Sequence, residues 1–184
     1  MIFSVSNIAW KPEERFKAYE LLASNGFKGL EIAPSLFFPN LEDPFHPTKK
    51  IIDLALTELS DYNISLVSMQ SILFNNKDSK LFGEIDQRDK FIKSIQRALE
   101  LANKLEIPNV VFGAPENRII ENNTDFNKAK DEAAKIFYAI GEDAKSNNTN
   151  LTIEPNPSCY GTNFINTISE SYNFVNLVNH PNIK

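Results

Sequence analysis

The stretch LTIEPNPSCYGTNF, residues 151–164, joins a short apolar run to a polar loop. The apolar run ends in Glu154, and Pro155 follows at once. Proline has no backbone N–H to donate to a neighbouring strand, so it ends the strand directly after the carboxylate. The stretch therefore predicts a buried strand over residues 150–154 that delivers a glutamate to the start of a loop.

Similar units recur along the chain, each with a short apolar strand, a polar loop and an amphipathic helix. The predicted strands cover residues 2–6, 29–33, 65–71, 109–112 and 150–154, and the predicted helices cover residues 12–25, 48–62, 84–105, 125–146 and 169–178. Residues 182–184 are typical of the first step of a sixth strand. Strands that alternate with helices predict parallel strands joined by right-handed crossovers.

The turn after the first predicted strand helps to choose between two α/β architectures. Residues 7–10 read NIAW and hold no glycine, whereas the dinucleotide-binding fold normally carries a glycine-rich turn there. The chain has no GxxxxGK[ST] phosphate loop either. The pattern favours a (β/α) TIM-barrel type over an open doubly wound sheet. We expect a single domain over residues 1–184, with about five of the eight βα units of a barrel, that stops before the sixth strand.

Alternation along the strands predicts which side chains point to the barrel axis. In the strand at 150–154, Leu151 and Ile153 are expected to pack on the helices, and Glu154 is expected to point to the axis. The same alternation predicts inward Ser4, Ser6, Glu31, Ser68 and Gln70, and outward Phe3, Val5, Leu30, Ile32, Val67 and Met69.

Glu154 is the first candidate for chemistry, because active sites of barrels lie at the carboxyl ends of the strands. A carboxylate at the rim of an apolar barrel is costly unless a cation or hydrogen bonds compensate it. A divalent metal would do so and would allow acid–base chemistry near neutral pH. A salt bridge to a nearby lysine or arginine is the structural alternative.

The strand ends supply further candidate substrate-binding residues. Glu31 is compatible with a second acid, a substrate hydrogen bond or a structural ion pair. Ser68 and Gln70 are neutral hydrogen-bonding groups that suit sugar hydroxyls, or they satisfy loop backbone groups. Asn156 and Tyr160 follow Glu154 and are expected to line the same pocket.

The loops contain the other chemistry-bearing side chains. Arg118, in the stretch GAPENR, suits a carboxylate or a phosphate, and the alternative is a surface arginine. The loop at 37–47 carries His46 and is a candidate lid. We expect His180 to sit at a helix end away from the site, and Cys159, which lacks a histidine partner, to serve packing.

Composition narrows the class of partner and the compartment. The net charge is −5 and the basic residues are spread along the chain, which argues against a nucleic-acid partner. No apolar stretch approaches the ~20 residues that span a bilayer, and the N-terminus has no basic leader, so no membrane partner is expected. A single cysteine excludes an internal disulfide framework and fits a cytoplasmic location.

Five stretches of the chain carry a family resemblance when taken together. They are GFKGLEIAPS, SLVSMQSILF, VVFGAPENR, LTIEPNPSCYGTNFINT and HPNIK. In this order and spacing they resemble the sugar-phosphate isomerase/epimerase family, the xylose isomerase-like TIM barrels, from the first strand to the start of a sixth. The resemblance implies an eight-stranded (β/α) barrel with one divalent metal, which is Mn, Mg, Co or Zn.

The resemblance also implies roles for particular residues. Glu154 would be both a metal ligand and the catalytic residue that moves a proton at the carbon next to a carbonyl, through an enediol(ate). The loop with Arg118 and the polar ends of the second and third strands would hold the substrate. The expected function is a metal-dependent isomerase or epimerase of a sugar or sugar phosphate.

The chain departs from the family pattern at its end. The family's other metal ligands, an Asp, a His and a Glu from later strands, would lie beyond Lys184. We therefore expect the 184-residue chain alone to bind metal weakly and to be inactive, and unpaired first and fifth strands to promote self-association.

Three alternatives stay open from the sequence. A related lyase or dehydratase would use the same proton removal, and a non-catalytic truncated barrel would only bind a ligand or a partner protein. A DNA-repair endonuclease shares the fold by resemblance, and the acidic balance and the scarcity of histidine argue against it.

Overall fold

A computed structural model describes residues 2–184 and contains one parallel sheet. Its strands are β1 (Ser4–Ser6), β2 (Gly29–Ile32), β3 (Ser65–Met69), β4 (Asn109–Phe112) and β5 (Asn150–Ile153). Each strand pairs with the next one in the sequence, in the order β1-β2-β3-β4-β5. A doubly wound sheet would reverse its strand order part-way. The sequential order therefore confirms the (β/α) barrel type, and these five units form part of such a barrel.

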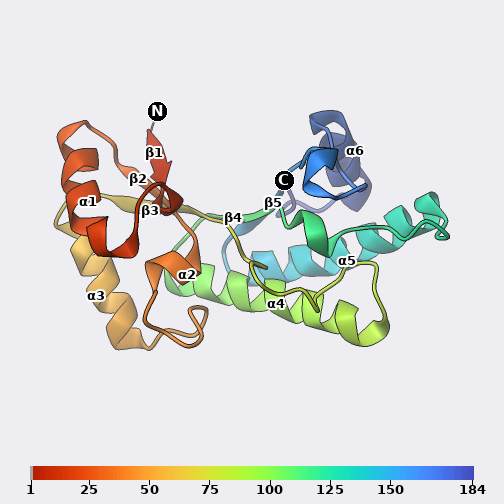
Figure 1. Ribbon diagram of the computed structural model, residues 1–184, viewed down its shortest axis with the longest axis horizontal. Helices are drawn as coiled ribbons and strands as arrows, with labels where there is room; N and C mark the ends of the chain where they lie inside the picture. Colours follow the sequence, from red (N-terminus) through yellow and green to blue (C-terminus); the bar gives the residue numbers. More distant parts are fainter. Residues whose placement is uncertain (1) are drawn as a thin grey trace.

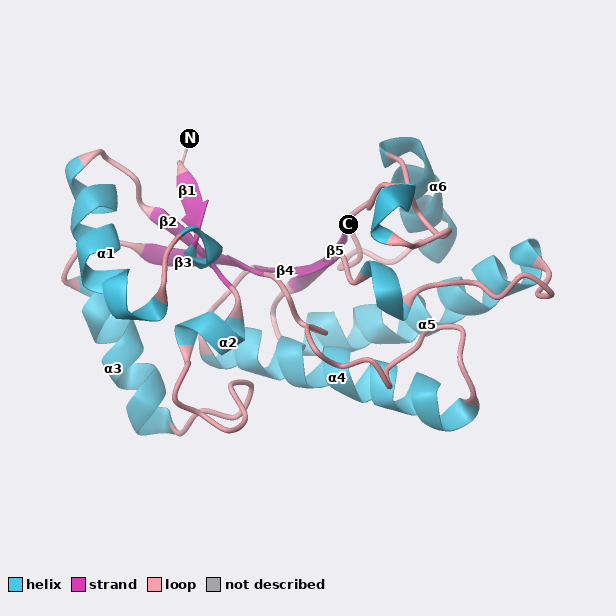
Figure 2. Cartoon of the chain, in the orientation of Figure 1, coloured by secondary structure: helices cyan, strands magenta, loops and turns pink. Residues whose placement is uncertain are grey.

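Helices follow the strands as the alternating pattern predicts. They are α1 (Arg15–Ser24), α2 (Pro34–Phe37), α3 (Lys49–Ser60), α4 (Ile85–Lys104), α5 (Phe126–Ser146) and α6 (Ile168–Val178). Figure 1 shows α4 and α5 running side by side below the sheet, with α3 on one flank and α6 on the other. Figure 2 shows that the strands occupy the middle of the molecule, with the helices around their outer side. The short helix α2 was not predicted.

The helix starts follow from local sequence. Asp125 precedes α5, and its carboxylate accepts hydrogen bonds from the N–H groups of Asn127 and Lys128 at 3.0 and 3.2 Å. Thr167 precedes α6 and forms a capping box with Glu170. Both arrangements satisfy N–H groups that have no partner inside the helix.

Residues 182–184 add to the far edge of the sheet. Ile183 bridges Leu151 in the parallel sense, and the Ile153 N–H donates to the carbonyl of Lys184 at 2.7 Å. The predicted start of a sixth strand is therefore confirmed. The expectation that the fifth strand is an unpaired edge is wrong, because these residues cover it. Within residues 2–184, β1 pairs only with β2.

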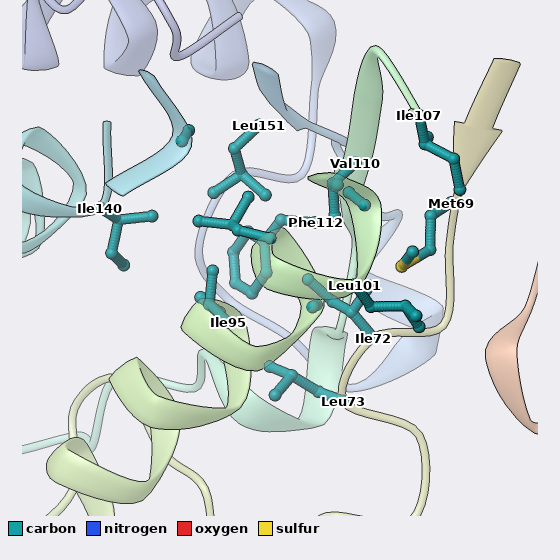
Figure 3. Close-up of a cluster of buried hydrophobic side chains, with 14 of the residues drawn as sticks. Met69, Ile72, Leu73, Ile95, Leu101, Ile107, Val110, Phe112, Ile140 and Leu151 are labelled. Atoms are coloured by element: carbon teal, nitrogen blue, oxygen red, sulfur yellow. The ribbon is translucent and has the colours of Figure 1, made fainter. Parts of the chain in front are cut away.

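The helix-facing side chains of the sheet build the core. Phe112 of β4 is buried, and its ring lies 5.6 Å from that of Phe91 in α4 and 5.2 Å from that of Phe137 in α5. Phe137 continues the series to Phe174 of α6 at 5.4 Å. Figure 3 shows Phe112 and its aliphatic neighbours Leu151 and Ile95 in the same cluster. Through this series of ring contacts, β4 packs with three successive helices, α4, α5 and α6.

A bulge in β3 overturns part of the predicted alternation. The register shifts between Leu30 and Glu31, so that Leu30 pairs with Leu66 while Glu31 pairs with Ser68. The extra residue, Val67, has a side-chain methyl only 3.2 Å from where a Cβ on Gly29 would stand. Val67 therefore lies on the inner face with Gly29 and does not face the helices. A bulge inserts one extra residue into a strand, so the alternation of side chains between the two faces of the sheet shifts by one residue after it.

Replacing Phe137 with alanine should remove the middle of this aromatic series. We expect Phe137→Ala to lower the free energy of unfolding by about 3–5 kcal/mol, because the side chain is fully buried and leaves a cavity. Urea denaturation measures the change. Phe74→Ala, at a phenylalanine that is 69% exposed, is the control and should change stability by about 0.5 kcal/mol at most. Equal losses in both variants would contradict the central place of Phe137.

Candidate functional site

A cavity opens at the carboxyl ends of the strands, where barrel active sites lie. Its volume is about 500 Å³. Three loops line it, those that follow β3, β4 and β5. The lining residues are Gln70, Ser71, Ile72, Leu73, Phe74, Asn75, Asn76, Lys77, Val111, Gly113, Ala114, Pro115, Glu116, Asn117, Glu154 and Tyr160. Of the sequence-predicted site residues, this cavity brings together Gln70, Glu154 and Tyr160.

Glu154 stands where the sequence predicts it, directly after β5. Its N–H donates to the carbonyl of Phe112 at 3.0 Å, which extends the ladder with β4 by one step. One carboxylate oxygen, Oε2, accepts a hydrogen bond from Nδ2 of Asn156 at 3.3 Å. The same oxygen lies against Gly113, where an added Cβ would collide with it. Gly113 therefore leaves room for the carboxylate at the cavity wall.

No lysine or arginine forms an ion pair with Glu154 in the part of the chain that the structure describes. The side chain is exposed to the cavity. The structural alternative of a salt bridge is thus absent among residues 2–184. A carboxylate in this position keeps free lone pairs that are able to accept a proton.

Arg118 lies behind the site and not in it. Its side chain is fully buried, and its Nη2 donates to the backbone carbonyl of Glu154 at 2.9 Å and to Oδ1 of Asn156 at 2.7 Å. Burial lowers the pKa of Arg118 to about 10, while the negative charge of Glu154 acts in the opposite direction. The surface-arginine alternative is wrong, and Arg118 is not among the residues that line the cavity.

The loop between β5 and α6 is held in place by side-chain amides. Asn166 donates from Nδ2 to the carbonyl of Asn156 at 2.8 Å. Asn163 exchanges two hydrogen bonds of 2.8 Å with the backbone of Ile120. Ile165 has a φ of 60°, which is rare for a β-branched residue, and its carbonyl accepts from the N–H of Asn156 at 3.1 Å. These contacts fix the segment that carries Asn156 and Tyr160.

Polar side chains also form a band across the inner face of the sheet. Gln70 donates from Nε2 to Oγ of Ser6 and to Oε1 of Glu31, both at 2.7 Å. Ser68 accepts from Nδ2 of Asn109 at 3.4 Å. Glu31, Ser68 and Asn156 do not line the cavity. Gln70 is the member of this band that also reaches it.

The loop between β3 and α4 supplies much of the cavity wall, and it was not predicted as part of the site. Its key contact is Asn117, which donates from Nδ2 to the carbonyls of Asn76 and Ser79 at 2.8 and 2.6 Å. The carbonyl of Asn117 accepts in turn from the Leu81 N–H at 2.8 Å. The turn-forming run NNKDS at 75–79 was the available signal.

The two histidines and the cysteine lie outside the cavity lining. His180 is buried at the other end of the barrel, where Nδ1 accepts from the Asn182 N–H at 3.1 Å and Nε2 faces a carboxylate oxygen of Glu142 at 2.8 Å. His46 is exposed and pairs with Asp43 at 2.6 Å. The predicted lid at 37–47 contributes no lining residue. Cys159 is exposed, so its predicted packing role is wrong.

The donor set around Glu154 does not make a metal centre by itself. Residues 2–184 contain no group of three or more His, Cys, Asp or Glu side chains that could hold a metal ion. The nearest side-chain partner of Glu154 is the amide of Asn156. Glu154 thus offers one carboxylate ligand, whereas a divalent metal needs several.

None of the helices in the described chain is long and apolar enough to cross a membrane.

The description of the family model that matches this chain is "xylose isomerase-like TIM barrel", and the match covers residues 19–184. The chain belongs to this family. The match begins within α1 and continues to the last residue, so it contains Glu154 and the three cavity loops. No curated protein matches the sequence.

Solved structures of several activities share this fold. A D-psicose 3-epimerase from Clostridium cellulolyticum H10 superposes with a TM-score of 0.78 at 18% identity, covering 100% of this chain and 62% of that one. The probable 3-DHS dehydratase AsbF from Bacillus anthracis gives 0.65 at 15%, covering 100% and 61%. An AP endonuclease, family 2, from Brucella melitensis gives 0.67 at 16%, covering 100% and 67%. At these identities the likeness shows the xylose isomerase-like fold alone, and the chain spans less than two thirds of the first two structures.

Removing the side chain of Asn117 should release the β3–α4 loop from the cavity wall. Asn117→Ala leaves two carbonyls without their donor, so we expect a loss of about 2–3 kcal/mol in the free energy of unfolding. We also expect faster hydrogen exchange over residues 75–81. Asn122→Ala, at an exposed asparagine of the same β4–α5 loop that contains Asn117, is the matched control. Unchanged exchange over residues 75–81 would show that the loop does not depend on Asn117.

Proposed function

We propose that this site isomerises or epimerises a sugar by moving a proton at the carbon next to a carbonyl. The observation that carries the proposal is the position of Glu154. Its carboxylate faces a cavity of about 500 Å³ at the carboxyl ends of the strands, without an ion-pair partner among residues 2–184. A carboxylate in such a place is suited to act as a general base and then as a general acid.

The remaining cavity wall is compatible with a sugar. The volume falls within the range of about 300–1,000 Å³ that is usual for small-molecule sites. Neutral hydrogen-bonding groups such as Gln70 and Ser71 suit hydroxyl groups, and the aromatic side chains Phe74 and Tyr160 offer apolar surface to the carbon skeleton. Glu31, Ser68, Arg118 and Asn156 would contribute from the layer behind these residues.

The comparisons support a sugar as the substrate class. The D-psicose 3-epimerase has the same fold over the whole of this chain, and so does an L-ribulose 3-epimerase, with a TM-score of 0.73 at 15% identity. Both names describe inversion at one carbon of a ketose. A phosphate on the sugar has no evident anchor, since Arg118 is buried and Lys77 is the only basic residue of the described cavity lining.

A divalent metal would need ligands in addition to Glu154. Glu154 would supply one carboxylate ligand to Mn, Mg, Co or Zn, and the other ligands would come from outside residues 2–184. When bound with Glu154 as one ligand, such a metal would supply polarisation of a carbonyl oxygen. The proton transfer assigned to Glu154 is derived without it, from the free lone pairs of the carboxylate. We expect residues 1–184 alone to show no turnover.

A dehydratase is the second candidate, because the loss of water next to a carbonyl begins with the same proton removal. The similarity in fold to the probable dehydratase AsbF supports this second candidate. The two reactions differ in their products, since a dehydratase releases water and leaves a double bond. Product analysis by NMR therefore separates them within one assay.

Substitution of Glu154 tests the proposal directly. The intact gene product is assayed on a panel of ketohexoses and ketose phosphates with Mn²⁺, Mg²⁺ or Co²⁺ present. We expect Glu154→Gln to lower kcat by about 10²–10⁴-fold, because the amide does not accept the proton. Glu132→Gln, at an exposed glutamate of α5, is the matched control and should retain wild-type turnover.

Two outcomes would count against the proposed function. Retention of more than about a tenth of wild-type kcat by Glu154→Gln would remove this residue from the chemistry. Sugar binding by the wild-type protein without any turnover would favour the non-catalytic alternative.

A further inference from the structure

We propose that Arg118 and Asn156 are positioning residues that fix the orientation of the Glu154 carboxylate. Neither side chain is among the residues that line the cavity. The inference deepens the proposed function and rests on it. It assigns a task to a buried cation that the sequence predicts only as a substrate ligand or a surface residue.

The geometry dictates which end of the Asn156 amide faces Glu154. A guanidinium group carries donors only. Because Nη2 of Arg118 lies 2.7 Å from the Asn156 side chain, the atom that faces it has to be the carbonyl oxygen Oδ1. The NH₂ group then points the other way, and Nδ2 donates to Oε2 of Glu154 at 3.3 Å. Arg118 therefore sets the amide so that it presents a donor to the carboxylate.

The hydrogen bonds from Arg118 to Asn156 and from Asn156 to Glu154 form a relay. The backbone around this relay is also held in place. The same Nη2 of Arg118 donates to the carbonyl of Glu154 at 2.9 Å. The N–H of Asn156 donates to Ile165, and its carbonyl accepts from Asn166. Gly113 leaves room for the carboxylate, since an added Cβ would collide with Oε2. Oε2 of Glu154 thus accepts from one hydrogen-bond donor and lies against one glycine.

The electrostatics agree with this coupling. Arg118 has no carboxylate in hydrogen-bond contact, and its Nε and Nη1 have no partner within the described residues. A buried cation with so few partners is costly, and an apolar side chain of similar size would often be more stable there. The negative charge of Glu154 favours the charged form of Arg118, against the effect of burial on its pKa. Supporting the loop does not by itself require a cation at this position. Fixing the orientation of the Asn156 amide requires a group that only donates hydrogen bonds, and the guanidinium of Arg118 is such a group.

Asn156→Asp separates positioning from structural support. An aspartate keeps an oxygen acceptor for Arg118 and adds an opposite charge beside the buried guanidinium. It removes the NH₂ donor and places a second carboxylate against Glu154. Asn122→Asp makes the same chemical change at an exposed asparagine of the loop between β4 and α5, outside the cavity lining, and is the matched control.

In the intact protein, under conditions that give wild-type turnover, we expect Asn156→Asp to lower kcat by about 10²-fold, since misplaced groups lose a factor of this size. We expect KM to stay within about threefold of wild type, because the cavity lining is unchanged. The thermal midpoint should equal or exceed that of wild type. Asn122→Asp should keep wild-type kcat. A kcat within about threefold of wild type in Asn156→Asp would overturn the proposal, and so would a loss that merely follows the fraction of unfolded protein.

A structural readout keeps the inference testable if the proposed function fails. Wild-type protein without turnover on any sugar would refute the function and leave the relay to be decided by crystallography. We expect crystals of Asn156→Leu to show the Glu154 carboxylate turned away from Gly113 or in more than one rotamer. A single unchanged rotamer would overturn the relay, whatever the enzyme activity.

Discussion

Each strand of this sheet runs parallel to the one before it, so all five strands end at the same edge. Parallel pairing requires a helical crossover between neighbours, and the crossovers cover one face of the sheet with helices. The apolar side chains of Leu30, Phe112 and Leu151 then pack against these helices. The polar side chains are left on the other face, and the loops that follow the strands meet at one end. The location of the candidate site is a consequence of this single constraint.

Asparagine side chains hold the loops at this end, where no regular secondary structure does so. Asn117 joins the loops that follow β3 and β4, and Asn163 joins those that follow β4 and β5. A side-chain amide has both donors and an acceptor, so one residue is able to satisfy backbone groups of two segments. Arg118 adds a buried set of donors behind Glu154. The carboxylate is left with free lone pairs on a support that is itself held by hydrogen bonds.

Much of this fold could be predicted from the sequence, because periodicity and turn residues act locally. The strands, the five longer helices and the pairing of residues 182–184 with β5 follow from such patterns. The carboxyl-end position of Glu154 follows from Pro155. The bulge at Val67 could not be predicted, because strict alternation has no means of placing an extra residue.

Which polar and charged side chains become buried could not be predicted from local sequence either. Arg118 occurs in a polar stretch, yet its side chain is fully buried and donates hydrogen bonds to the segment after β5. The reverse holds for Cys159, which occupies a loop turn with nothing packed over it. Such outcomes depend on contacts between distant segments, as in the hydrogen bond from Arg118 to Asn156. The cavity role of the β3–α4 loop depends in the same way on Asn117.

The most direct test of this account is solvent exchange at the reacting carbon. The intact protein is incubated with a ketose in D₂O, and the recovered sugar is analysed by NMR. If Glu154 moves a proton at the carbon next to the carbonyl, one deuterium should enter that carbon with wild-type protein and not with Glu154→Gln. Equal deuterium incorporation with both proteins would contradict the assignment of proton transfer to Glu154.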